Sequence, residues 1–161
     1  KLEEGKPVVV YSGDDSTFEY IYKFVSTAPY YKNTAGGHLL NDGILYVARF
    51  NEDGSGEWLP LDISNSDFTA KATAAGVTFA DQADVLLNTR LAADIAGATK
   101  MDRPEWGAVH PETGEVYFTL TNNTQRTTAQ VDAANPRASN TTRPRNSNAT
   151  PMPMALVINS A

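Results

Sequence analysis

A chain of 161 residues with 41 % hydrophobic residues is long enough for one domain with a packed core. It has no cysteine, which excludes a disulfide or a thiolate metal site within the chain. Its formal net charge of −6 argues against a nucleic-acid backbone as partner, because phosphate backbones bind basic surfaces. No apolar run approaches the roughly 20 residues of a membrane helix. The chain opens at Lys1 without an initiator Met or a signal peptide, as a processed or fragmentary chain would.

Two strands joined by an acidic turn are predicted near the start. PVVVYSGDD (residues 7–15) opens with a β-branched run that favours a strand and ends in turn residues. FEYIYKFVS (18–26) alternates aromatic and polar residues, as a half-buried strand does. Asp14 and Asp15 then lie at the tip of a hairpin. Aspartate in a turn usually caps its own backbone, but two adjacent carboxylates can also ligate a hard cation.

The next segment is predicted as a loop followed by a second hairpin. Residues 28–43 are rich in Pro, Asn, Asp and Gly, which is typical of a loop. ILYVARF (44–50) is the clearest strand of the chain, and the Asp53-Gly54 pair after it is a strong hairpin-turn signal. EWLPLDI (57–63) provides the return strand, with its proline near the end or on an edge.

One helix is predicted, over residues 79–100. Apolar residues recur there at three- and four-residue spacing, namely Ala83, Leu86, Leu87 and Leu91. Gly97 is a natural C-terminal stop for this helix.

The chain then returns to short strands. EWGAVHP (105–111) and EVYFTLTNN (115–123) are joined by PETG, which is typical of a type I turn. Many short strands with regular turns indicate a β-sandwich, a barrel or a propeller, and the similarity of DGILYVARF to TGEVYFTLTNN is of the kind that propeller blades leave. After Asn122 the sequence is rich in Thr, Asn, Arg and Pro, which predicts a long surface loop or disordered linker. Residues 155–158 could add an edge strand.

The segment DRPEW, where helix gives way to strand, carries the most distinctive charges. Pro104 restricts Arg103 to an extended backbone, so the side chains of Arg103 and Glu105 are expected to point the same way, as residues i and i+2 of a strand do. The pair has two interpretations. One is a structural ion pair at the junction. The other is an anion site beside a cation site, since Arg offers a planar fork to phosphate and Glu a hard oxygen to a metal such as Ca²⁺.

Other motifs offer little chemistry. His38 lies in a Gly-rich loop and His110 in a turn before Pro111, and two isolated histidines do not define a Ser-His-Asp triad. The sequence contains no phosphate-binding loop, no GxGxxG and no HExxH, and NEDGSGEW only faintly suggests a calcium loop.

Four stretches, taken in order, resemble the PhoX family of bacterial secreted alkaline phosphatases. They are VVVYSGDDSTFEYIYKFVS, GILYVARFNEDGSGEWLPL, ADVLLNTRLAADIAGATKMDRPEWGAVHPETGEVYFTLTNN and DAANPRASN. The resemblance runs from about residue 7 to residue 140. Its most specific part is the long run from NTRLAADIAGATKMDRPEW into TGEVY.

The resemblance implies a mostly β fold, part of a β-propeller with one inserted α-helix, and hydrolysis of phosphate esters with Ca²⁺ and iron as cofactors. It implies that Arg103, as catalytic and substrate-binding residue, contacts phosphate and that Glu105 ligates metal. Asp14 and Asp15 are the next candidates for metal ligands. It also implies export to the periplasm or beyond.

Two departures from the family pattern bear on these expectations. Family members are several times longer, so residues 1–140 would make about two blades, with further chain segments needed to complete the propeller, and 141–161 a divergent low-complexity tail. The iron-binding Cys of the family has no counterpart here. A non-catalytic extracellular β module that binds Ca²⁺ or a partner is therefore the alternative.

Overall fold

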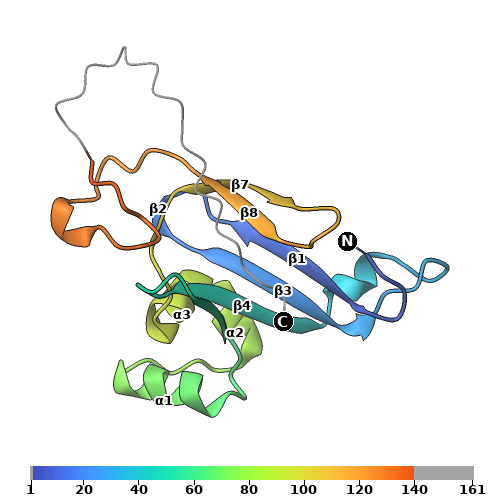
Figure 1. Cartoon of the computed structure of the whole chain (residues 1–161). Coiled ribbons are helices and arrows are strands. Elements are labelled where there is room, and N and C mark those ends of the chain that lie inside the picture. Colours follow the sequence, from blue (N-terminus) through green and yellow to red (C-terminus); the bar gives the residue numbers. More distant parts are fainter. Residues whose placement is uncertain (1, 140–161) are drawn as a thin grey trace. The chain divides into compact units, whose positions relative to one another are not determined.

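The computed structural model describes residues 2–139, and the chain is built mainly of short β-strands (Figure 1). The strands are β1 (Pro7–Gly13), β2 (Thr17–Glu19), β3 (Ile21–Pro29), β4 (Gly43–Phe50), β5 (Gly56–Pro60), β6 (Met101–Asp102), β7 (Pro104–Val109) and β8 (Val116–Leu120). The helices are α1 (Ser66–Ala74), α2 (Gln82–Leu87) and α3 (Thr89–Ala96), with 3-10 turns η1 (Gly37–Leu40) and η2 (Thr128–Gln130). The predicted mostly β class is confirmed. The described residues divide into two compact units.

The first unit, residues 2–12, 22–49 and 57–98, holds a four-stranded sheet in the order β1-β3-β4-β5. Strands β3 and β4 pair antiparallel, with Tyr22 opposite Val47. Both of these residues are buried, but β3 does not show the predicted alternation, because Ile21 and Lys23 on either side of Tyr22 are buried as well. The neighbours β1–β3 and β4–β5 are the two predicted strand pairs.

The predicted helix over 79–100 is in fact two helices, α2 and α3, divided at Asn88. The Asn88 side chain donates to the Asp84 carbonyl at 3.0 Å and to its carboxylate at 2.9 Å. Such side-chain bonds to a nearby backbone compete with the helical pattern, which explains the break. The stop at Gly97 is confirmed, with φ +85.

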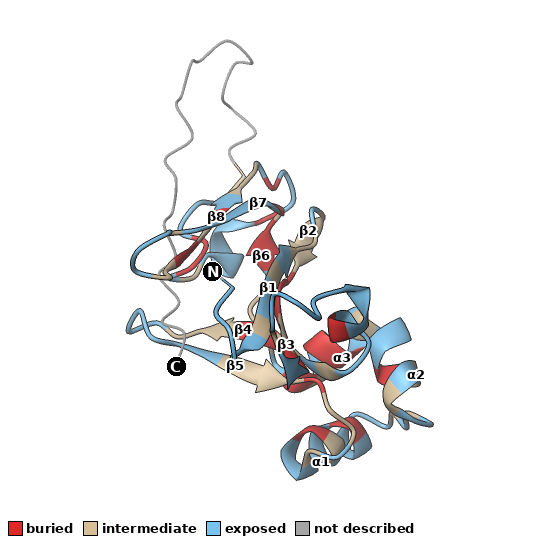
Figure 2. Ribbon diagram, turned by 90° about the vertical axis from the view of Figure 1, so that its right-hand side faces the viewer, coloured by how far each residue is buried: buried red, intermediate tan, exposed pale blue. Residues whose placement is uncertain are grey.

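Helix α1 was not predicted, so the expectation of one inserted helix is wrong. Its start is set by Asn65, whose side chain accepts from the backbone N–H of Phe68 at 3.0 Å. Phe68 and Ala72 form its buried face (Figure 2), a stripe too short to stand out as a period in the sequence. Within residues 2–139, no helix has the length and apolar character to cross a membrane.

Gly43, where β4 begins, is required by a close approach to β3. A Cβ at this position would lie 2.3 Å from the carbonyl oxygen of Val25 and 2.5 Å from the ring of Phe24. We therefore expect Gly43→Ala to lower the free energy of unfolding by about 1–3 kcal/mol in urea titrations. Gly37→Ala is the matched control, since a Cβ there meets nothing within 4 Å. Equal stabilities for the two variants would contradict this packing.

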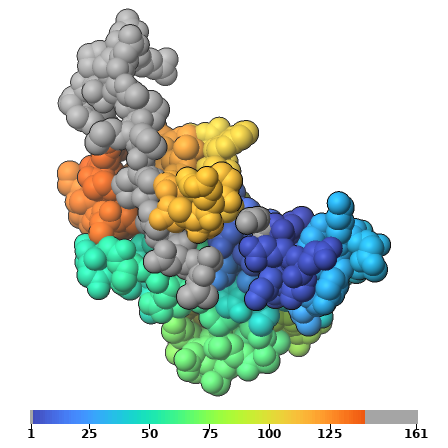
Figure 3. All heavy atoms as spheres, turned by 45° about the vertical axis from the view of Figure 1, so that its right-hand side comes forward, coloured from blue at the N-terminus to red at the C-terminus, as the bar shows by residue number. Residues whose placement is uncertain are grey.

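The second unit, residues 13–21, 50–56 and 99–139, contains two two-stranded sheets, β2-β6 and β7-β8. The β7–β8 hairpin confirms the predicted strand, turn and strand, with Val109 opposite Val116. In its turn the hydroxyls of Tyr117 and Thr113 donate to Glu115 and hold the pKa of that carboxyl below its usual value. The atoms of this hairpin, yellow to amber, lie on the surface in Figure 3.

Residues 123–139 form the expected surface loop, mostly exposed and without a helix or strand apart from η2, but a few buried residues anchor it. Asn123, Arg126 and Asn135 of this segment are each at most 4 % exposed, and η2 carries a capping box between Thr127 and Gln130. Composition did not reveal that this loop is anchored, because most of its buried residues are polar. The tail over 141–161 and the edge strand at 155–158 lie outside the described residues.

Candidate functional site

Arg103 lies between β6 and β7 in a left-handed backbone conformation, with φ +49. The expected extended backbone is therefore wrong, although Pro104 follows. The Thr121 N–H donates to the Arg103 carbonyl at 3.2 Å and holds the peptide in place. A left-handed conformation costs a non-glycine residue roughly 1–2 kcal/mol and persists only where the surroundings enforce it.

Glu105 lies at a β-bulge rather than at a regular strand position. Pro104 pairs with Leu120 and Trp106 with the adjacent Thr119, so Glu105 is the extra residue on β7. The expected i and i+2 relation between Arg103 and Glu105 is wrong for the same reason: Arg103 precedes the strand and the strand is irregular at Glu105. The Glu105 carboxylate belongs to an exposed residue.

Asp15 is brought to Arg103 across 88 positions of sequence. Nη2 of Arg103 lies 3.1 Å from Oδ1 and 3.3 Å from Oδ2 of Asp15. The two side chains are 37 % and 39 % exposed, so the pair is open to solvent and to a ligand. Asp14 is adjacent, with its backbone N–H on the carbonyl of Tyr20 at 3.1 Å. The structure therefore places the GDD turn beside the RPE triplet.

Gly13 makes this juxtaposition possible. A Cβ on Gly13 would lie 2.6 Å from the carbonyl oxygen and 2.8 Å from the Cβ of Pro104. Only glycine allows the two backbones to come this close. The glycine of the GDD turn is thus required for the packing of the site.

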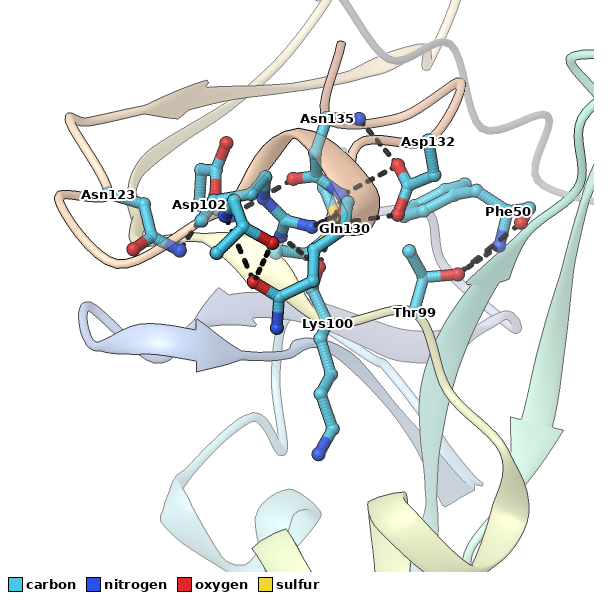
Figure 4. A network of polar contacts seen from close by, with 11 residues as sticks. Phe50, Thr99, Lys100, Asp102, Asn123, Gln130, Asp132 and Asn135 are labelled. Atoms are coloured by element: carbon cyan, nitrogen blue, oxygen red, sulfur yellow. Dashed lines mark hydrogen bonds and ion pairs between the residues drawn. The ribbon is translucent and has the colours of Figure 1, made fainter. Parts of the chain in front are cut away.

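A buried polar network surrounds Asp102, the residue that precedes Arg103 in the sequence (Figure 4). Nε of Arg126 donates to Oδ1 of Asp102 at 2.6 Å, with side chains 3 % and 12 % exposed. Asn123 donates to the same oxygen at 2.9 Å, and Asn135 accepts from the Asp102 N–H at 3.0 Å. Asp102, the residue before Arg103, is therefore fixed through both its backbone and its carboxylate.

Arg126 is the residue that sequence reasoning missed. Its remaining nitrogens donate to the carbonyls of Gln130 at 2.5 Å and Lys100 at 2.7 Å, and its guanidinium lies 5.1 Å from the ring centre of Phe18. Nothing around Arg126 in the sequence distinguishes it from an exposed arginine. The only hint was the abundance of Asn, a residue suited to buried hydrogen bonding, in the same segment.

The carboxylates near Arg103 do not make a complete metal site by themselves. Ca²⁺ takes six to eight oxygen ligands, whereas residues 2–139 contain no group of three or more His, Asp or Glu placed to hold a metal. Asp15 is engaged with Arg103, and Glu105 supplies a single carboxylate. This donor set does not fit the calcium and iron centre expected from the resemblance, and any such centre needs ligands beyond the described residues.

Comparisons with known proteins place the chain in a family. A family model described as alkaline phosphatase PhoX matches residues 1–143. The solved structure of Pseudomonas fluorescens PhoX in complex with vanadate, a transition state analogue, is similar, with 42 % sequence identity and a TM-score of 0.74. The match covers 86 % of this chain and 25 % of that chain. Among curated proteins none matches significantly.

The chain therefore belongs to the PhoX alkaline phosphatase family, and the resemblance found in the sequence is confirmed. It spans a quarter of the length of the solved relative. The division into residues 1–140 as a partial propeller and a tail stays a prediction.

Proposed function

We propose that this chain carries part of the active site of a metal-dependent phosphoric ester hydrolase, an alkaline phosphatase. Arg103 contacts the phosphoryl group, and Glu105 is a metal ligand. The observation that carries the proposal is the backbone strain at Arg103, whose side chain is partly exposed. The preceding residue, Asp102, is fixed by its ion pair with Arg126. Strain that the surroundings maintain is typical of functional positions.

The chemistry of phosphoryl transfer suits this arrangement. Negative charge spreads over the phosphoryl oxygens in the transition state, and catalysis consists largely of positioning and neutralising it. Arginine offers parallel N–H donors that match two phosphate oxygens. Glu105 offers one hard oxygen ligand to Ca²⁺, with further ligands from parts of the protein beyond the described residues.

The wider expectations belong to the same proposal. Asp14 is a further candidate metal ligand. Asp15 differs from it in that its carboxylate pairs with Arg103. Calcium and iron are the proposed metals, a propeller completed by further segments is the proposed setting, and the periplasm or the exterior is the proposed location. Support comes from membership of the PhoX family.

The second candidate is a non-catalytic extracellular β module that binds Ca²⁺ or a partner. It is favoured by the formal net charge of −6, which suits a protein that binds cations. Such a module would gain stability from Ca²⁺ without hydrolysing esters.

Glu105→Gln separates these candidates. In the purified full-length protein we expect loss of bound calcium, by about one ion per chain, together with a fall in phosphate ester turnover of about 10²-fold. Glu112→Gln in the β7–β8 turn is the matched control, since it removes an equally exposed carboxylate of the same hairpin. Calcium loss in a protein that never hydrolyses esters would favour the binding module, and unchanged calcium and turnover would contradict the role of Glu105.

A further inference from the structure

We propose that Asp15 is a positioning residue, whose carboxylate orients the Arg103 guanidinium toward phosphate and does not ligate a metal. The inference rests on the proposed role of Arg103 in phosphate contact. It replaces the expectation, drawn from sequence, that Asp15 is a metal ligand.

The pairing of β2 with β6 brings the two side chains together. Thr17 lies opposite Asp102 in this antiparallel pair. One step beyond this pair, Arg103 comes level with Ser16, the residue next to Asp15. The strand pairing therefore brings the two segments side by side, and the close approach of Gly13 to Pro104 holds the same two segments together.

The contact leaves most of the guanidinium available. Both oxygens of Asp15 lie near a single nitrogen, Nη2. Asp15 thus engages the guanidinium through this one nitrogen. Arginine has five N–H donors, so Nε and Nη1 keep an edge for two phosphate oxygens while Nη2 is anchored.

Stability does not account for the pair. Ion pairs as exposed as this one contribute little to folding, and Arg103 additionally occupies a costly left-handed conformation. The exposed pair of Arg49 and Glu57, at 2.6 Å, shows that this fold also makes surface pairs on regular strands without such strain. Fixing a long side chain before its ligand arrives does reduce the entropy lost on binding, and this is what a positioning residue supplies.

The geometry is unfavourable for a metal on Asp15. Both of its oxygens lie within 3.3 Å of the same cationic nitrogen. A divalent cation on either oxygen would therefore lie close to the guanidinium, and like charges so close together repel even near a protein surface. If Asp15 only orients Arg103 and binds no metal, this repulsion does not arise.

The first test measures the mobility of the Arg103 side chain by ¹⁵N relaxation at Nε in the purified protein. We expect an order parameter close to that of rigid backbone in the unchanged protein and below about 0.6 in Asp15→Asn. Asp15→Glu restores part of the order, and Glu112→Gln leaves it unchanged. An order parameter that is the same in Asp15→Asn as in the unchanged protein overturns the proposal.

The second test uses phosphate ester kinetics, inorganic phosphate inhibition and calcium content in the full-length protein. Asp15→Asn is expected to raise KM and the inhibition constant of phosphate roughly 3- to 10-fold, with a smaller change in kcat. Its calcium content stays that of the unchanged protein, and loss of a calcium ion overturns the proposal. A failure of the proposed function would be seen separately, as full turnover in Arg103→Ala, whereas the relaxation result decides the positioning role by itself.

Discussion

Replacing Arg126 by Ala is expected to lower the free energy of unfolding of the second unit by about 3–5 kcal/mol. The substitution leaves the Asp102 carboxylate at 12 % exposure without its cationic partner, and it removes donors from the carbonyls of Lys100 and Gln130. Breaking one side of a buried ion pair costs more than the net contribution of the pair, because the remaining charge stays desolvated. Urea unfolding followed by far-UV circular dichroism measures the change.

Asp15→Asn provides the comparison within the same unit. It breaks the half-exposed pair with Arg103 and should change stability by only about 0–1 kcal/mol. If Arg126→Ala were no more destabilising than Asp15→Asn, the network around Asp102 would not be the structural anchor of the site.

Arg103→Ala is expected to lower kcat/KM for a phosphate monoester by about 10²- to 10³-fold in the full-length protein. The reason is the loss of the donors that stabilise charge on the phosphoryl oxygens. Arg103→Lys should recover only part of the rate, since an ammonium carries charge without the planar fork. Initial rates over a range of substrate concentrations separate the effects on kcat and KM.

Arg103→Gly serves as the control for folding. At φ +49 glycine avoids the cost that an L side chain incurs, so this variant should be more stable than Arg103→Ala by about 1 kcal/mol while equally inactive. Full activity in either variant would remove Arg103 from the site.

Local patterns predicted the strands well. The β-branched and aromatic run of β4 and the glycine turns on either side carry their signal within a few residues, and so does the β7–β8 hairpin with Gly114 at φ +77. The helical region was harder, because Asn88 interrupts an otherwise continuous apolar period with side-chain bonds that spacing alone does not reveal.

The site itself depends on contacts between distant residues. Sequence singled out Arg103, Glu105 and Asp15. It did not predict that Asp15 pairs with Arg103, since this contact depends on the pairing of β2 with β6 and on the close approach of Gly13 to Pro104. The extended conformation that Pro104 favours at Arg103 is not adopted, and Glu105 lies at a bulge that residue spacing does not reveal. Arg126 and Asn135 looked like exposed loop residues. Their burial was not predictable because their hydrogen-bond partners lie 24 to 35 positions away in the sequence.

A crystal structure of the full-length protein grown with Ca²⁺ and orthovanadate tests the central claim most directly. Vanadate mimics the phosphoryl group in the transition state, and we predict its oxygens within hydrogen-bond distance of Nε and Nη1 of Arg103, with Nη2 still on Asp15 and a cation on Glu105. Vanadate bound away from Arg103, with no cation at Glu105, would contradict the account.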